Sequence, residues 1–393
     1  MMGLERRMRA LGLLAIASLC ACEIHGIVGA NLDGAGDGGG GGDHGVLGDE
    51  QSPSSTTGGE DGVGGGTGGG DGDTTAADPF LFDVSPGDGA EVCLAPYPTS
   101  CDHVDEDPWH ALGVTCAGGA RVDTSILAHS DAVYVHTGPL GTSGAYTPRE
   151  GQRMVIVSTG KARDVPRSRT ELGCFDETCP SSALAAGSAM SSLPAPMDVR
   201  AVDPSLTCTD DPELVGTGDC SNTLADEWTT GQVVYDYAEL RLSAKVPEHA
   251  DALVYEFAFF SAEYPSRVDQ AQGPSSNDMF VAWLESEAWT GNVSFDGQGN
   301  PISINGVFLD YLDADSDRCT EHPCVAPELD GFAMDGHAGT RWLETVAPVV
   351  PGEEIEIIFA IFDIGDPELD SAVVLDGVHW GCTDLPPVTA PTG

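Results

Sequence analysis

The sequence predicts a mainly β protein with an antiparallel β-sandwich or jelly-roll-like body. This body follows a disordered Gly/Asp-rich linker and a Cys-rich irregular region. Three observations in the sequence support this prediction of the fold class. Residues 239–246 alternate apolar and polar side chains, as a half-buried antiparallel strand does. Further short apolar runs follow at close intervals, separated by Gly, Asn, Pro and Asp, and no alternation of strands with helices appears. The hydrophobic fraction of 41% is sufficient for a core.

The first 21 residues have the layout of a signal peptide. Its basic residues are Arg6, Arg7 and Arg9. The apolar run at 11–19 is too short to span a bilayer. The following "LCAC" resembles the bacterial lipobox, which would make Cys22 the lipidated first residue of the mature chain. Cys20 fits less well, because a Leu would stand in the small-residue position; the open alternative is an ordinary secreted protein cleaved near Ala21.

Residues 22–78 are expected to form a flexible tether. Between positions 31 and 75 the chain is rich in Gly and Asp and almost free of large apolar residues, so burial cannot offset the entropy of ordering. The expected organisation is signal peptide 1–21, tether 22–78, Cys-rich β or irregular region 79–230, β-sandwich 231–385 and flexible tail 386–393.

Ten cysteines follow the predicted lipidation site: Cys93, Cys101, Cys116, Cys174, Cys179, Cys208, Cys220, Cys319, Cys324 and Cys382. An even number in an exported protein predicts disulfides. Short-range pairing favours 174–179, 319–324, 208–220 and 93–101, which leaves 116–382, although spacing alone leaves other connectivities open. Zinc is the competing use of these cysteines, but no C-x-x-C occurs.

Individual elements can be placed along the body. Short strands are predicted at 132–136 and 153–158, and a short Ala-rich helix at 181–193. Residues 252–264 are apolar on both faces, which predicts a central strand. Trp283 is expected in the core, whereas Trp289, beside a turn, is expected to be exposed and able to stack on sugars.

A strand ending in "SAEY", an "ND" before the next strand, and the closing "IFDIGD" and "DSAVVLD" resemble the choice-of-anchor L domain, a family of bacterial surface domains. The resemblance covers about 233–382. The matching residues are Ser261, Glu263, Tyr264, Asn277, Asp278, Asp363, Asp366, Asp370, Ser371 and Asp376. Ala262 stands where a second Glu is frequent in the family. The resemblance implies an extracytoplasmic β-sandwich and surface display, and it implies no catalytic residue or substrate.

The acids of this motif are candidate ligands of a structural Ca²⁺. Strand ends meet at the rims of a sandwich, and closely spaced carboxylates raise one another's pKa unless a cation is present. The candidates are Glu263, Asp278, Asp363, Asp366 and Asp370. The alternative is that they cap turns by accepting backbone N–H bonds.

A second, weaker calcium candidate is "DYLDADSDRC", with Asp310, Asp313, Asp315 and Asp317. Arg318 and Cys324 occupy the places where an EF-hand needs Gly and Glu, so an EF-hand is excluded. A solvated acidic loop closed by a disulfide is the competing interpretation.

The net charge of −47 excludes nucleic acid as a partner, because phosphate backbones are bound through Lys and Arg. No nucleophile elbow, H-E-x-x-H or P-loop is present, so no catalytic residue is predicted. The expected function is a lipid-anchored binding or structural protein at the outer membrane or cell surface of a Gram-negative bacterium. It would contact the membrane through its lipid and recognise a surface protein or glycan. The alternative is a secreted or surface hydrolase of cell-surface polymers.

Overall fold

A computed structural model describes residues 93–96, 100–103, 105–116, 122–174, 179–181, 189–225, 228, 233–268, 277–306, 308–316, 318–319 and 322–392. These residues all belong to one compact unit, Asp83–Gly393. The predicted signal peptide, the lipidation site Cys22, the tether, Asp317 and most of the helix expected at 181–193 lie outside the described residues.

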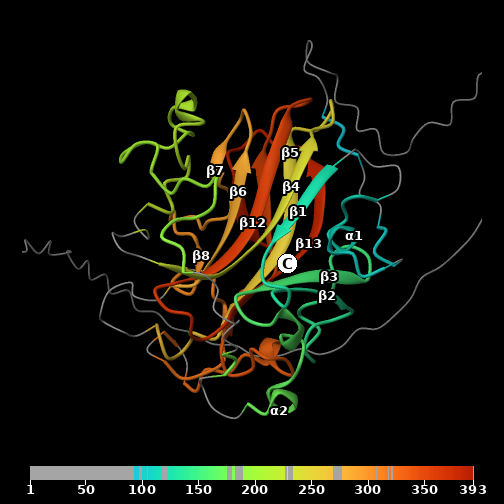
Figure 1. The fold of residues 1–393 in the computed structure, drawn as a ribbon, viewed down its shortest axis with the longest axis vertical. Helices are drawn as coiled ribbons and strands as arrows, with labels where there is room; N and C mark the ends of the chain where they lie inside the picture. The colour runs from blue at the N-terminus through green and yellow to red at the C-terminus, as the bar shows by residue number, and fades with distance from the viewer. Residues whose placement is uncertain are drawn as a thin grey trace, which may run out of the picture. The chain divides into compact units, whose positions relative to one another are not determined.

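Two antiparallel sheets form the body (Figure 1). The first has the order β1 (Val122–Leu127), β4 (Val234–Lys245), β12 (Glu354–Ile364), β6 (Met279–Glu285) and β7 (Thr290–Asn292), and β8 (Ile302–Ser303) also pairs with β6. The second has the order β14 (Val388–Pro391), β11 (Leu343–Pro348), β5 (Ala252–Ser261), β13 (Ser371–Gly381), β3 (Arg153–Ser158) and β2 (Val133–Thr137). β10 (Ala338–Gly339) joins β5 to β9 (Tyr311–Leu312).

Helices are few and short among the described residues. They are the α-helices α1 (Pro108–Ala111) and α2 (Arg169–Leu172) and the 3₁₀-helices η1 (Ala162–Asp164), η2 (Pro212–Leu214) and η3 (Pro327–Leu329). No helix in this described part of the chain has the length and apolar character needed to cross a bilayer.

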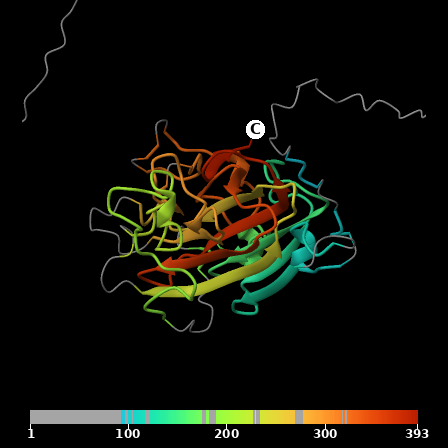
Figure 2. The same ribbon diagram turned by 90° about the horizontal axis from the view of Figure 1, so that it is seen from above.

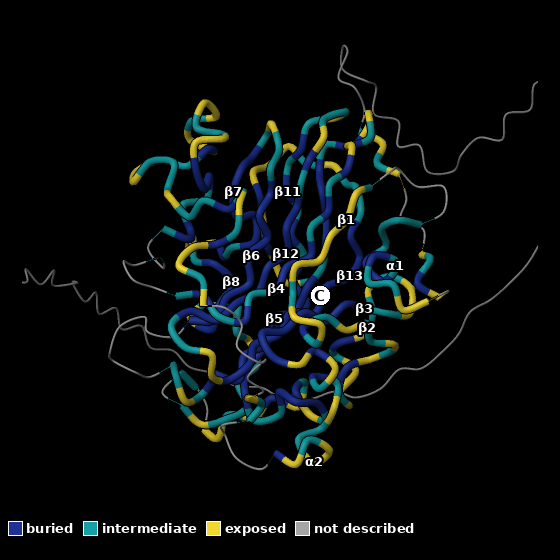
Figure 3. Tube along the Cα trace, in the orientation of Figure 1, coloured by how far each residue is buried: buried dark blue, intermediate teal, exposed yellow. Residues whose placement is uncertain are grey.

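The main core lies between the two sheets, which pack together as layers (Figures 1 and 2). Alternate residues point into it, such as Leu240, Phe257 and Phe359, because successive side chains of a strand face opposite sides. The intervening residues of the central strands are buried as well, under loops that cover the outer faces (Figure 3). Such two-sided burial explains why β5 is apolar throughout. The predicted central strand and the predicted mainly β sandwich are both confirmed.

The part of the chain before residue 231 is not a separate layer from the part after it. β1 pairs with β4, and β3 pairs with β13, so strands from both parts build both sheets. The expected boundary at 230/231 therefore divides one sandwich. At the other end, β14 pairs with β11 over part of the segment expected to be a flexible tail. The sequence analysis did not predict β1 or β14, because β1 is largely exposed and β14 is only four residues long.

All ten described cysteines form disulfides. The predicted pairs 174–179, 208–220 and 319–324 are confirmed. The predicted pairs 93–101 and 116–382 are wrong, since the structure joins Cys93 to Cys382 and Cys101 to Cys116. The backbone beside Cys93 bonds to the β4–β5 turn, Leu94 N–H donating to His249 O over 2.7 Å, and this turn lies next to the end of β13. A contact distant in sequence thus brings Cys93 to Cys382.

The two tryptophans considered above are both buried. Trp283 is 2% exposed, as predicted, whereas Trp289 is 3% exposed and the prediction of an exposed ring is wrong. Trp289 directly precedes β7 and packs in the core between the sheets, and its indole N–H donates to Asn292 O over 3.3 Å. The turn beside it therefore folds its ring inward, and it is not available to stack on a sugar.

Candidate functional site

Five carboxylates gather at one end of the sandwich, and we call them the carboxylate cluster: Asp236, Glu263, Asp278, Asp363 and Asp370. Strand register explains their meeting. Phe362 pairs with Met279, so the neighbouring Asp363 and Asp278 come together at the ends of β12 and β6. Ser371 pairs with Ser261, which brings the start of β13, with Asp370, beside the segment that follows β5 and holds Glu263.

Asp236 reaches the cluster through an irregularity in β4. The register between β4 and β12 shifts between Ile361 and Asp363, so two residues of β4 oppose one of β12. Asp236 lies in this bulge with a φ of 47°, a value that non-glycine residues rarely adopt. The bulge turns an acidic side chain toward Asp363 and Asp370.

Hydrogen bonds connect the cluster internally. Asp278 N–H donates to Glu263 Oε2 over 3.2 Å, and the Ser371 hydroxyl donates to Asp278 Oδ2 over 2.5 Å. The carboxyl groups of Asp278 and Asp363 bond to each other, and the Thr159 side chain bonds to Asp363. Asp363 Oδ1, in a side chain only 1% exposed, has no hydrogen-bond partner among the described residues.

Burial and like charge make this site electrostatically costly. Burial raises the pKa of Asp278 and Asp363 well above the usual range, and neighbouring carboxylates raise it further. Burial also raises the pKa of Glu263 to about 7 and that of Asp236 to about 6. At neutral pH the site therefore either retains protons or requires a compensating positive charge.

Asp366, the fifth predicted ligand, lies at the edge of the cluster, where its charge raises the pKa of Glu263. Its carboxylate lies 3.5 Å from the Arg267 guanidinium, which also pairs with Glu368 over 2.7 Å. The Asp366 side chain is 28% exposed, and its Oδ1 also accepts the Glu368 N–H. It is a surface ion-pair partner and turn cap.

Asp370 connects the cluster to a cavity. A cavity of about 160 Å³ is lined by Asp370 together with Ser158, Lys161, Met334 and the disulfide-bonded Cys174 and Cys179. The Asp370 carboxylate also packs directly on the backbone of Gly160, where an added Cβ would lie 2.1 Å from Asp370 Oδ2. Only glycine fits at that position without a shift of Asp370.

Sequence reasoning missed Asp236, Thr159 and Gly160. A signal existed for Asp236, because the alternation of β4 places it on the buried side with Val234 and Ala238. A charged residue at an inward position is unusual enough to mark a site. Thr159 and Gly160 follow β3 and carry no comparable signal, since their roles depend on the pairing of β3 with β13.

The acidic loop at 310–318 does not form a comparable site among its described residues. Asp310 pairs with Arg341 over 2.9 Å, and Asp313 accepts the N–H groups of Ala326 and Gly336. Asp315 accepts the N–H of Cys324. Each of these three carboxylates has its own donor, which favours the interpretation as a solvated loop closed by a disulfide.

Asp376, another residue of the motif, is buried in the middle of β13 away from the cluster. Its carboxylate accepts three backbone N–H groups, from Arg149, Glu150 and Gly377. Burial nevertheless raises its pKa to about 8. It anchors the segment before β3 and shares no ligand position with the cluster.

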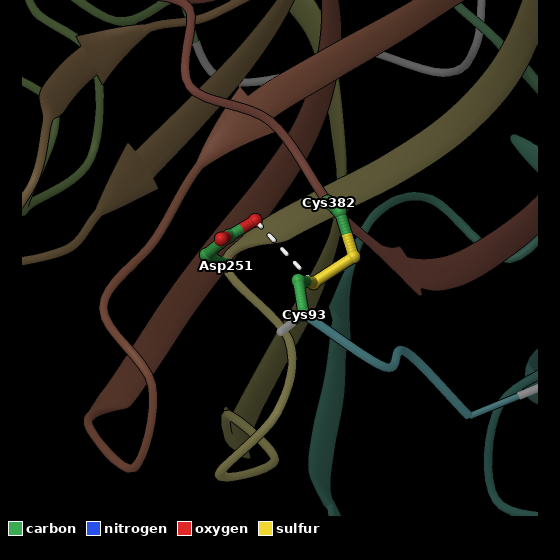
Figure 4. A group of neighbouring side chains, drawn as sticks. All are labelled: Cys93, Asp251 and Cys382. Atoms are coloured by element: carbon green, nitrogen blue, oxygen red, sulfur yellow. Dashed lines mark hydrogen bonds between the residues drawn. A yellow bond between two sulfur atoms is a disulfide. The ribbon is translucent and has the colours of Figure 1, made fainter. Parts of the chain in front are cut away.

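Two groups of sulfur and carboxylate atoms lie as close together as metal ligands: Cys93, Asp251 and Cys382, and Asp315, Cys319 and Cys324. In the first, Cys93 Sγ lies 3.7 Å from Asp251 Oδ1 (Figure 4). All four cysteines are in disulfides, and a disulfide offers no thiolate for a metal. Neither group has the chemistry of a zinc site.

Searches of curated proteins and of solved structures give no match. The family model of the choice-of-anchor L domain matches residues 153–379, more than half of the 393 residues. This match begins at β3, ahead of the expected boundary at 231, in agreement with the shared sheets. The family is not a known enzyme family, and it indicates a surface-associated, extracytoplasmic protein. The chain belongs to the choice-of-anchor L domain family.

Proposed function

We propose that this protein is a lipid-anchored binding or structural protein of the bacterial cell surface. The observation that carries the proposal is the disulfide set: all ten described cysteines are paired, one pair spanning 289 positions of sequence. Such a framework forms and persists in an oxidising, extracytoplasmic compartment. The signal-peptide-like N-terminus and its "LCAC" motif supply the lipid anchor at Cys22.

The tether and the acidic surface fit this role. A glycine-rich segment of about 50 residues has a root-mean-square reach on the order of 40 Å, enough to hold the sandwich away from a membrane. The net charge of −47 keeps the body soluble and repels anionic headgroups, so the lipid is the membrane contact. We place the anchor in the outer membrane of a Gram-negative bacterium and the body in contact with a surface protein or glycan.

A hydrolase is not favoured by any specific observation. The two cavities with defined linings contain carboxylates, Asp164 and Asp370 in one and Asp123, Glu248 and Glu354 in the other. Neither lining includes an aromatic residue among the described residues, and aromatics are what a polysaccharide cleft would need for stacking on sugar rings. Binding or structural support is the better fit.

The anchor can be tested in the full chain expressed in a Gram-negative host. Cells fed radioactive palmitate should label the parent protein and the matched control Cys20→Ser, whereas Cys22→Ser should lose the label and appear in the soluble periplasmic fraction. Protease added to intact cells should cleave the parent protein if it faces outward. Labelling that survives Cys22→Ser, or a parent protein that carries no label, would contradict the lipid anchor.

A further inference from the structure

β1 is the end strand of the first sheet, and no described strand pairs with its outer edge (Figure 1). In an antiparallel pair, every second residue directs its N–H and C=O groups away from the partner strand. Among the described residues, no hydrogen bond reaches the backbone of residues 124–127 from the side away from β4. These four residues are all exposed (Figure 3). β1 therefore presents main-chain donors and acceptors that a further strand could use.

The other end strands of the two sheets are protected, which sets β1 apart. β7 is buried, and its Thr290 O accepts the Cys220 N–H over 2.9 Å from a neighbouring segment. β14 has only four residues and ends in Pro391, a residue that blunts a sheet edge. β2 packs against α1 and η1. Natural proteins protect their edge strands in such ways, so the bare edge of β1 indicates a use.

An apolar side chain of β1 shows what the inner face of an added strand would meet. Residues directly opposite each other in a sheet share a face, and Ile126 lies opposite Leu240, which is buried in the core between the sheets. Ile126 points to the same side but is 43% exposed, so the core reaches the surface at this edge. Apolar side chains at alternate positions of an added strand would cover Ile126 and remove it from water.

The outer face of the same edge is acidic. Asp123 lies on the face of β1 opposite to Ile126 and lines a groove together with Glu248 and Glu354. Lys245, the basic residue of this lining, lies 3.6 Å from Glu248, so three carboxylates share the groove with one ammonium group. The whole chain has 63 acidic and 16 basic residues. Electrostatic complementarity therefore favours Lys or Arg on the outward face of an added strand.

We propose that β1 is a docking edge for a protein partner at the cell surface, which adds an extended segment of alternating apolar and basic residues to the first sheet. Main-chain hydrogen bonds would join this segment to residues 124–127, with its apolar side chains beside Ile126 and its basic side chains beside Asp123. The inference rests on the proposed function as a surface binding protein and names the class of its partner.

A second copy of this chain fits the edge less well. Pairing β1 with β1 of another copy would bring together two chains that each carry a net charge of −47. The added strand would then have the sequence VDTSIL, which contains Asp123 and no basic residue. Like charges at an interface are unfavourable, whereas a basic segment is attracted by the same surface.

The binding test uses the full chain and two synthetic peptides of six residues, the length of β1. One peptide alternates Val and Lys, and the other has its Val residues in one block and its Lys residues in another, so that charge and composition match. Fluorescence anisotropy of the labelled peptides should show saturable binding of the alternating peptide, at least about tenfold tighter than that of the block peptide. The block peptide measures attraction by charge alone.

Amide hydrogen exchange shows whether the bound peptide is an added strand. The alternating peptide should slow exchange within residues 124–127, because their outward N–H groups would then be bonded. The block peptide should leave exchange in this segment unchanged.

Two substitutions at neighbouring exposed positions locate the contact. Ile126→Lys and Leu127→Lys add the same charge at side chains that are 43% and 53% exposed and lie on opposite faces of β1. Ile126→Lys should weaken binding of the alternating peptide about tenfold, because it removes the apolar contact and places a charge at the edge. Leu127→Lys is the matched control and should weaken it by no more than about twofold. Circular dichroism checks that both variants are folded.

Several outcomes would overturn the proposal. If the parent binds neither peptide, binds both equally, or loses binding equally on Ile126→Lys and Leu127→Lys, strand addition does not occur. Protection of every amide of residues 124–127 before peptide is added would mean that another segment of this chain already covers the edge. A dimer of the parent that Ile126→Lys abolishes would mean that a second copy does. Palmitate labelling at Cys22 depends on none of these results, so the lipid anchor and the docking edge can fail separately.

Discussion

The turn between β12 and β13 and the acidic loop at 310–318 are similar as sequences. Each brings several Asp residues within about ten positions, at the end of strand-like runs, with few basic residues nearby. In the structure, the residues flanking the turn, Asp363 and Asp370, meet acids from β4, β6 and the end of β5. The described acids of the loop instead each find an arginine or a backbone N–H group.

The difference shows that acid spacing alone does not define a site. A carboxylate in a loop can turn toward any nearby donor, and Asp313 and Asp315 have backbone donors within reach. A carboxylate at a strand end is fixed in direction by the ladder, because the register decides which neighbour it faces. Asp363 faces Asp278 for that reason.

The largest effect is expected for a third kind of acid, the buried Asp376, which has its own backbone donors. Its pKa is raised from an ordinary value of 3.8 to about 8, mainly by burial. Between about pH 4 and pH 8 the folded state therefore keeps a proton that the unfolded state has lost. The contribution of this carboxyl to the free energy of unfolding is complete below about pH 4 and decreases as the pH rises to about 8. Between pH 5 and 7 the loss amounts to about 1.4 kcal/mol per pH unit.

Asp376→Asn mimics the protonated carboxyl and should remove that slope. The measurement is urea denaturation of the parent and the variant at several pH values between 5 and 7, compared by slope. The groups facing Asp376 are Glu150, which raises its pKa, and Arg149, whose guanidinium is paired with Glu256 over 2.8 Å. Parallel curves for parent and variant would mean that Asp376 is ionised in the folded protein and that its three N–H donors outweigh burial.

How far the sequence predicts these sites depends on whether the partners are local. The sandwich, the central strand β5 and the three close disulfides follow from alternation and spacing within short stretches. The pairing of Cys93 with Cys382 does not, because 289 positions separate them and only the folded sheets bring them together. Four of the five predicted ligands do gather. The fifth, Asp366, acts on Glu263 from the surface and also pairs with Arg267, an arginine on another segment that no spacing rule could have indicated.

A smaller effect is expected for Gly160→Ala, which tests how closely the Asp370 carboxylate packs against the backbone that follows β3. The new Cβ would lie 2.1 Å from Asp370 Oδ2 and force that carboxylate to move. Overpacking of this kind costs about 1–3 kcal/mol of unfolding free energy. Urea denaturation of the parent and the variant measures this loss of unfolding free energy.

The control for that substitution is Gly297→Ala. No atom lies within 4 Å of a Cβ at Gly297, and its backbone is outside the left-handed region. This variant should be as stable as the parent or slightly more so. Equal destabilisation of both variants would mean that the loss of a glycine, and not the contact with Asp370, lowers the stability. A Gly160→Ala variant as stable as the parent would show that the Asp370 carboxylate moves freely.

The smallest effects belong to the acidic loop, where two neighbouring acids differ in the donors they satisfy. Asp313 accepts two backbone N–H groups, from Ala326 and Gly336, so Asp313→Ala should cost about 1 kcal/mol by leaving them unbonded. Asp315 is 62% exposed and Asp315→Asn retains an acceptor for the Cys324 N–H, so its stability should change by less than about 0.5 kcal/mol. A loss of stability on Asp315→Asn as large as that on Asp313→Ala would contradict this prediction, because the number of bonded N–H groups would then not decide the effect.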